Sequence, residues 1–105
     1  MRKKQWFLVF NHVRIDVTIN IDRGKIVGFS VNLSIEEEGE KKDIARWDTA
    51  HGYLHKYEFW GTTKTIKDKK YENVSLDVAF REIYKDMIGD WRKFVERWKN
   101  ARKSN

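Results

Sequence analysis

The chain has 105 residues, 40% hydrophobic and 36% charged, so it can bury one core and does not have the composition of a disordered protein. It contains no cysteine, which excludes disulfides and thiolate metal sites. Its formal net charge is +6, and Lys and Arg bind polyanions with release of counterions, so nucleic acid is the first class of partner to consider. We expect a single domain over residues 1–105.

The first third of the chain predicts a long antiparallel hairpin. A dense apolar strand over residues 4–10 is followed by residues 13–21, in which every second side chain is apolar. Period two is typical of a half-buried strand. The turn at residues 22–25 contains a glycine, and the alternation resumes over residues 27–35, beginning with Val27 on the apolar face.

The middle of the chain predicts one more turn and strand, followed by a loop. Residues 36–42 form an acidic turn around Gly39, and residues 43–48 return as a strand. Beyond Trp60, the polar and basic segment 61–73 predicts a loop or irregular ribbon.

The last third predicts one long helix. Ser75 is a suitable N-cap, and apolar residues recur at helical spacing from Leu76 to about Ala101. Gly89, near the middle, is a candidate position for a bend. We therefore predict an α+β fold, in which an antiparallel sheet of about four to five strands carries one long C-terminal α-helix on one face.

This helix is long for a small sheet, which leaves two interpretations open. In one, a bent helix wraps its own core; in the other, the protein is a homodimer through the C-terminal helix. The apolar run near the N-terminus is too short for a signal peptide, and no stretch is long enough to span a membrane. We expect a cytoplasmic protein without membrane contact, and its abundance of Lys, Glu and Arg resembles thermophile composition.

The polar face of the hairpin offers a first candidate site. In the predicted strand over residues 27–35, every second residue on the polar face is small. This pattern predicts a shallow lane, edged by charged residues, that would accept a flexible ligand. The small residues are Gly28, Ser30, Asn32 and Ser34, and the charged ones are Arg14, Asp16, Arg46 and Asp48. The alternative is an ordinary solvated sheet face.

The segment ARWDTAHGYLHKYEFW, residues 45–60, offers a second candidate site. Arg46 and Asp48 are two apart at a strand end and should share a face. His51 and His55 have helical metal-ligand spacing, but Gly52 lies between them and the segment is too aromatic for a convincing helix. We predict no metal and no cofactor.

These residue types suit cleavage of RNA without a metal. Histidine can take or give a proton at neutral pH, and His51 and His55 are the candidates for general base and acid. Arg46 and Lys56 would stabilise charge on the phosphate, and Asp48 would orient a His or the Arg.

The main alternative is a binding or interaction protein without catalysis. In that case the basic side chains would contact nucleic acid and the histidines would hardly matter. The candidates are Arg14, Lys56, Lys64, Lys67, Lys69 and Lys70, together with Arg92, Arg97 and Arg102 of the helix. A structural homodimer with a buried central segment is a third interpretation.

The order of these features resembles the TumE-type toxins of prokaryotic type II toxin–antitoxin systems. The resemblance is carried by residues 44–49, by His51 and His55-Lys56, and by the helix pattern around Phe80, Trp91 and Phe94; it extends from Val13 onward. It implies nuclease-like activity that inhibits growth, and an antitoxin protein as partner.

The chain also departs from that pattern. The family has Tyr and Asn flanking the Asp, where this chain has Trp47 and Thr49. It also tends to have a second basic or His residue two positions after the last His, where this chain has Tyr57. The alternative is an uncharacterised prokaryotic family of similar layout.

Overall fold

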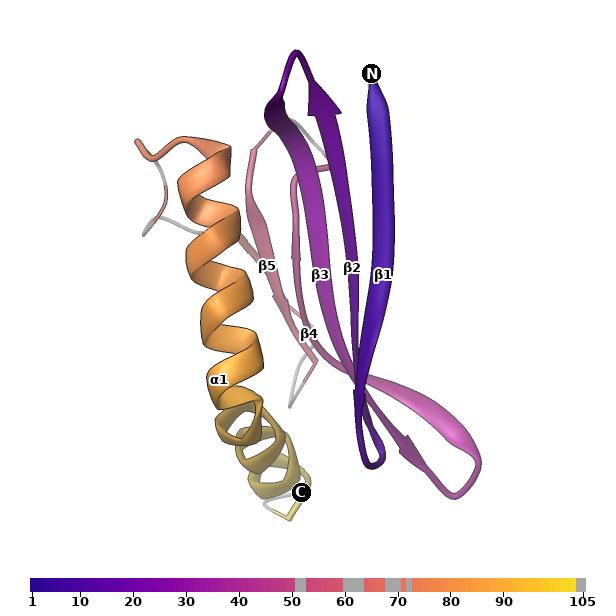
Figure 1. Cartoon of the computed structure of the whole chain (residues 1–105). Coiled ribbons are helices and arrows are strands. Elements are labelled where there is room, and N and C mark those ends of the chain that lie inside the picture. Colours follow the sequence, from indigo (N-terminus) through magenta and orange to yellow (C-terminus); the bar gives the residue numbers. More distant parts are fainter. Residues whose placement is uncertain (51–52, 60–63, 68–70, 72, 104–105) are drawn as a thin grey trace.

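The structure is a computed structural model that describes residues 1–50, 53–59, 64–67, 71 and 73–103. In this part of the chain, a six-stranded antiparallel sheet is followed by one helix, which packs against one face of the sheet (Figure 1). The elements are β1 (Arg2–Phe10), β2 (Val13–Asp22), β3 (Lys25–Glu37), β4 (Glu40–Asp48), β5 (His55–Glu58), β6 (Lys64–Lys67) and α1 (Leu76–Lys103). The strands lie in the sheet in chain order.

This architecture confirms the predicted fold class. The sheet has six strands where we expected about four to five. β5 falls in a segment for which no strand was predicted, and β6 lies inside segment 61–73, which we predicted to be a loop. Two of the tight hairpin turns place a non-glycine residue before a glycine, both with positive φ: Arg23-Gly24 joins β2 to β3, and Glu38-Gly39 joins β3 to β4. Positive φ at both central residues is the signature of the type I′ turn, whose twist matches that of the strands.

The predicted hairpin of β2 and β3 is confirmed, but one residue leaves the predicted face. Asn20 pairs with Gly28 and Ile21 pairs with Ile26, so Val27 is the extra residue of a β-bulge. Its side chain is 46% exposed, and its prediction as a core residue was wrong. A bulge shifts the alternation by one position, which a local pattern does not reveal.

The core lies between the sheet and α1. Alternate residues of β2 and β3 meet Phe80, Ile83 and Met87 of the helix, and Trp47 of β4 packs edge-to-face on Phe94 at 5.4 Å between ring centroids. The hydrophobic residues that β2 to β4 contribute are Val13, Ile15, Val17, Ile19, Phe29, Val31, Leu33, Ile35, Ile44, Ala45 and Trp47.

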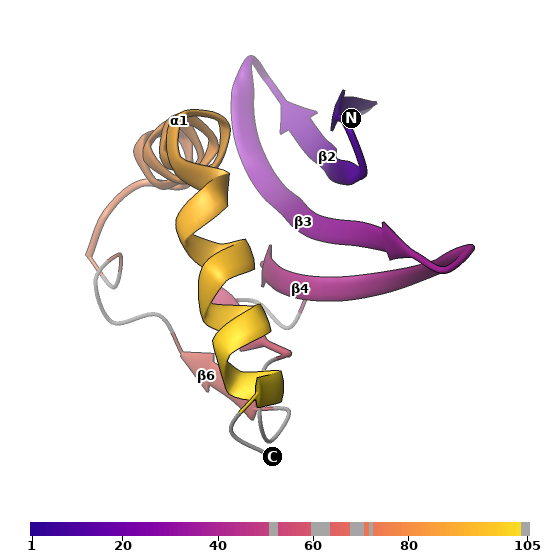
Figure 2. The same ribbon diagram turned by 90° about the horizontal axis from the view of Figure 1, so that it is seen from below.

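Helix α1 begins where the sequence predicts and bends near its middle (Figure 2). The Ser75 hydroxyl accepts a hydrogen bond from the Val78 N–H at 3.3 Å, as an N-cap does. Asp90, next to Gly89, has φ −144° and ψ 30°, which breaks the helix there and confirms the predicted bend. In the described part of the chain, no helix is both long and apolar enough to cross a membrane.

The far end of α1 is tied to the β3–β4 hairpin by ion pairs. Arg102 Nη1 lies 2.8 Å from Glu37 Oε1, and Lys42 Nζ lies 3.0 Å from the same oxygen. The hydrogen bond from Lys42, together with the bond and charge of Arg102, lowers the pKa of Glu37 from its ordinary value of 4.5.

Candidate nucleic-acid interface

The face of the sheet turned away from α1 carries a row of side chains that crosses five strands. Phe7 of β1 pairs with Asp16 of β2, and Asp16 pairs with Asn32 of β3. Asn32 pairs with Arg46 of β4, which in turn pairs with Tyr57 of β5. Because cross-strand partners project from the same face, these residues are neighbours although they are far apart in sequence.

Arg46 is held in place by a polar network on this face. Its Nε donates to Asn32 Oδ1 at 3.0 Å, and Asn32 Nδ2 donates to Asp43 Oδ1 at 3.0 Å. Arg46 Nη2 lies 3.6 Å from Asp43 Oδ2, which closes the triangle. Asn32 is 7% exposed, whereas the Arg46 side chain is 37% exposed, so a buried amide orients a guanidinium that still meets solvent.

Asp43 is a site residue that the sequence analysis missed. Leu33 pairs with Ala45 and Ser34 pairs with Asp43, so Ile44 is the extra residue of a second bulge. This bulge places Asp43 on the same face as Arg46. The spacing of three residues between them is not that of one strand face, so alternation alone gave no signal for it.

An aromatic strip runs along β5 beside Arg46. The rings of Tyr53, His55, Tyr57 and Phe59 follow one another with centroid separations of 4.0, 6.1 and 6.2 Å, and those of Tyr57 and Phe59 are nearly parallel at 7°. Tyr53 is 47% exposed, and Tyr57 and Phe59 are half-buried. We call Tyr53, Tyr57 and Phe59 the aromatic strip.

His55 lies within this strip but is closed off from solvent. It is 5% exposed, and its ring is flanked by those of Tyr53 and Tyr57. A histidine so buried lacks the open approach that our assignment as general acid or base requires. His51, the other proposed catalytic histidine, lies outside the described residues.

The predicted set of Arg46, Asp48, His55 and Lys56 does not converge as one cluster. Arg46 and Asp48 share a face as predicted, and Asp48 pairs with His55. The Asp48 carboxylate accepts a hydrogen bond from the Ala50 N–H at 2.6 Å, so it holds the turn after β4. Lys56 points to the opposite face, because neighbouring residues of a strand alternate.

Two contacts locate Lys56 on the helix side of the sheet. Its Nζ is 5.3 Å from the centre of the Trp47 ring and 3.7 Å from Glu58 Oε1. Lys56 and Arg46 therefore project from opposite faces of the sheet, and a contact of Lys56 with phosphate stays a prediction. Lys69 and Lys70 lie outside the described residues, and for Lys64 and Lys67 the structure describes only the backbone of β6.

Arg14 lies on the same face as Arg46 but toward β1. Its Nε donates to Asp16 Oδ1 at 2.9 Å, and its guanidinium carbon is 3.9 Å from the centre of the Phe7 ring. Asp16 and Phe7 therefore hold Arg14 at some distance from the aromatic strip, and β3 lies between Arg14 and Arg46.

The lane of small residues in β3 is filled rather than open. Gly28, Asn32 and Ser34 are buried. At one end, Thr49 Oγ1 accepts a hydrogen bond from the Phe29 N–H at 2.9 Å and lies above Gly28. At Asn32, the side chains of Asp43 and Arg46 lie within hydrogen-bond distance of the amide, and Ser30 is half-buried. These positions therefore do not form the shallow open lane that was one of the two interpretations.

The face therefore offers a stacking surface beside a positioned guanidinium. Among the residues that the structure describes, no three His, Asp or Glu side chains form a group able to hold a metal ion.

No significant match was found among curated proteins or among solved structures. A family model described as "domain of unknown function (DUF7718)" matches residues 1–104. This match agrees with the alternative of an uncharacterised family and gives no support to the TumE-type toxins. The chain belongs to the DUF7718 family.

Proposed function

We propose that this protein binds single-stranded RNA, without cleaving it, on the sheet face that carries Arg46 and the aromatic strip. The observation that carries the proposal is the pair of nearly parallel rings of Tyr57 and Phe59, with Tyr57 directly beside Arg46 in the sheet. Antiparallel sheets with aromatic side chains on an open face bind RNA by stacking unpaired bases on those rings.

Arg46 supplies the contact with phosphate. Its guanidinium is fixed by Asn32 and Asp43, so little side-chain entropy is lost when a ligand binds. The group has five N–H donors, of which Asn32 and Asp43 account for some, and the remaining donors suit the fork geometry of a phosphate.

The rest of the basic charge supports binding from a distance. Arg2, Lys3 and Lys4 are exposed at the start of β1, and the chain as a whole has a formal net charge of +6. This excess attracts a polyanion and makes its affinity fall with increasing salt.

Binding without cleavage is preferred because of His55. Metal-independent cleavage needs a side chain that reaches the 2′-hydroxyl, whereas His55 is 5% exposed between two tyrosine rings. The ribonuclease and its antitoxin partner, which the resemblance to TumE-type toxins implied, are therefore not part of this proposal.

The test is fluorescence anisotropy with a labelled oligoribonucleotide of about 12 nucleotides, the scale of one single-strand site. Tyr57→Ala and Phe59→Ala should each weaken binding by roughly 5- to 150-fold, the equivalent of about 1–3 kcal/mol for a lost base stack. Arg46→Gln should weaken binding and flatten its salt dependence.

Matched controls separate this site from general basic charge. Tyr71→Ala changes a half-buried tyrosine on the helix side, and Arg81→Gln removes an exposed arginine of α1. Both should bind RNA as the unaltered chain does. The proposal is overturned if the unaltered chain does not bind, if Tyr57→Ala binds as tightly as Tyr71→Ala, or if a duplex binds as tightly as the single strand. Cleavage that His51→Ala or His55→Ala abolishes would replace it with the ribonuclease.

A further inference from the structure

The first strand leaves one edge of the sheet open. β1 pairs with β2 on one side, and in the described part of the chain no strand lies on its other side (Figure 1). It has nine residues and contains no proline. Such an edge presents a row of backbone N–H and C=O groups that can pair with another strand.

Apolar side chains are exposed on both faces of this edge. On the face away from α1, Phe7 is 55% and Val9 is 56% exposed. On the helix side, Trp6, Leu8 and Phe10 are only half-buried. Large apolar groups on both faces of an edge strand are typical of a strand that continues into a partner.

The helix does not cover β1 because it lies over the middle of the sheet. α1 contacts chiefly β3 and β4 and reaches β1 only through flanking rings. The Trp6 indole N–H donates to the Tyr84 hydroxyl at 3.1 Å, and the Phe10 ring stacks on Trp91 at 5.7 Å. Tyr84 and Trp91 are themselves half-buried, so the core is incomplete on this side.

We propose that a second copy of this chain pairs antiparallel with β1, edge to edge, with Trp6 opposite Trp6, to form one continuous sheet. The distribution of charge along β1 favours this occupant. Arg2, Lys3 and Lys4 occupy one end of the strand, and residues 6–10 are all apolar. Parallel self-pairing would place Lys3 beside Lys3, which like charges disfavour.

Antiparallel self-pairing removes this repulsion. With Trp6 at the centre, Arg2 lies opposite Phe10 and Lys3 lies opposite Val9 of the other copy, and all nine residues of each strand are paired. The two Arg2 residues then lie at opposite ends of the paired strands, about 27 Å apart at 3.4 Å per residue, and the two Lys4 residues lie about 14 Å apart. The interface is isologous, as expected for a homodimer with two-fold symmetry.

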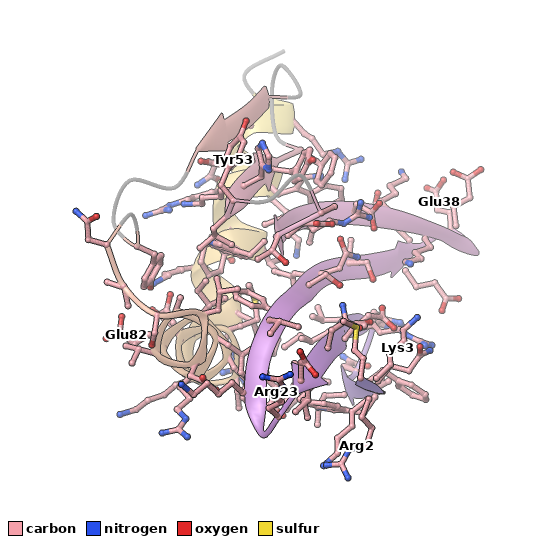
Figure 3. All side chains as sticks on the ribbon, turned by 90° about the horizontal axis from the view of Figure 1, so that it is seen from above. Arg2, Lys3, Arg23, Glu38, Tyr53 and Glu82 are labelled. Atoms are coloured by element: carbon pink, nitrogen blue, oxygen red, sulfur yellow. The ribbon has the colours of Figure 1, made fainter. Side chains whose placement is uncertain are left out.

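This interface is separate from the proposed RNA-binding surface. Figure 3 shows Tyr53 toward the opposite edge of the sheet from Arg2 and Lys3, with β3 and β4 between them. Two copies joined through β1 would therefore keep both aromatic strips free. It also differs from a dimer through α1, because α1 plays no part in the strand pairing.

Sedimentation equilibrium of the full chain over a range of concentrations tests the proposal. The unaltered chain should show a monomer–dimer equilibrium, and the double variant Phe7→Lys/Val9→Lys should weaken it at least tenfold. Val27→Lys and Val78→Lys are the controls, since both side chains are 46% exposed and belong to β3 and α1 rather than to β1. These controls should dimerise as the unaltered chain does.

A cross-link tests the register, because the chain has no native cysteine. In the proposed pairing, residue 5 of one copy faces residue 7 of the other, within the Cα separation that a disulfide spans. A mixture of Gln5→Cys and Phe7→Cys chains should therefore form disulfide-linked dimers faster than either variant alone. The proposal is overturned if the unaltered chain is monomeric throughout, if Val78→Lys rather than the double variant dissociates the dimer, or if the mixture cross-links no faster than the single variants.

Discussion

Asn32 holds Arg46 across two strands, through a hydrogen bond of 3.0 Å from the arginine Nε to the asparagine Oδ1. The same amide donates to Asp43, so one buried side chain satisfies a cation and an anion at once. This relationship gives an open sheet face a guanidinium with a fixed orientation, and the proposed function depends on it.

Replacing Asn32 should therefore lower the free energy of unfolding by more than an ordinary surface substitution does. Asn32→Leu removes the partner of both Arg46 and Asp43, and we expect a loss of about 1–3 kcal/mol in the free energy of unfolding. Urea denaturation measures it. Ser30→Ala, on the same face of β3, is the control and should change stability by less than about 0.5 kcal/mol. Equal stabilities of the two variants would show that the network contributes nothing.

A substitution in the turn between β3 and β4 should make the protein more stable. Glu38 has φ 54° and precedes Gly39 with φ 78°, so a glutamate occupies a left-handed position of a type I′ turn. Asn tolerates this conformation better, and Glu38→Asn should raise the free energy of unfolding by about 0.5–1 kcal/mol.

The comparison for this turn is Gly39→Ala, which forces a Cβ into the left-handed region and should destabilise. Thermal unfolding of both variants measures the effect. A Glu38→Asn variant no more stable than the unaltered chain would contradict the assignment of strain to residue 38.

Acid should weaken the attachment of α1 to the β3–β4 hairpin. The bonds from Lys42 and Arg102 lower the folded-state pKa of Glu37 below 4.5, so this group stabilises the fold at pH values above its unfolded-state pKa. That stabilisation is lost as the pH falls through the lowered folded-state pKa. Glu37→Gln should lack this part of the pH dependence.

The measurement is the free energy of unfolding by urea from about pH 7 down to about pH 3, the range over which carboxylates lose their charge. The difference between the unaltered chain and Glu37→Gln should shrink as the pH falls. Glu40→Gln, exposed in the same hairpin, is the control, and its difference should stay smaller throughout. A Glu37→Gln difference that is constant with pH would rule out the proposed linkage.

Substitution by alanine should change the stability of the protein in opposite directions at two glycines. At Gly28 a Cβ would lie 3.2 Å from Thr49 Oγ1 and 3.4 Å from Asn20 Nδ2, which displaces the Thr49 hydroxyl from the Phe29 N–H. Gly28→Ala should therefore destabilise by about 1–3 kcal/mol. At Gly89 no atom lies within 4 Å of the added Cβ, and Gly89→Ala should stabilise the helix by up to about 1 kcal/mol. Chemical denaturation of both variants in parallel tests this contrast. A change in the free energy of unfolding with the same sign in both variants would refute it.

The elements were predictable where a long local period specifies them. The alternation in residues 13–21 and the helical spacing after Ser75 both led to elements close to those observed. The Gly at residue 89 marked the bend to within one residue. The strand β5 was missed as a strand, because four residues are too few to display a period, and its alternation would have separated Lys56 from His55.

The amino-acid sequence by itself determined the class of fold, the hairpin and the helix, because alternation and helical spacing are properties of neighbouring residues. The tertiary structure decided which side chains share the site. The bulges at Val27 and Ile44 arise from pairing between strands, and the second of them brings Asp43 to Arg46. The burial of His55 depends on rings packed around it. Such contacts depend on the register of whole strands, which no short stretch of sequence specifies.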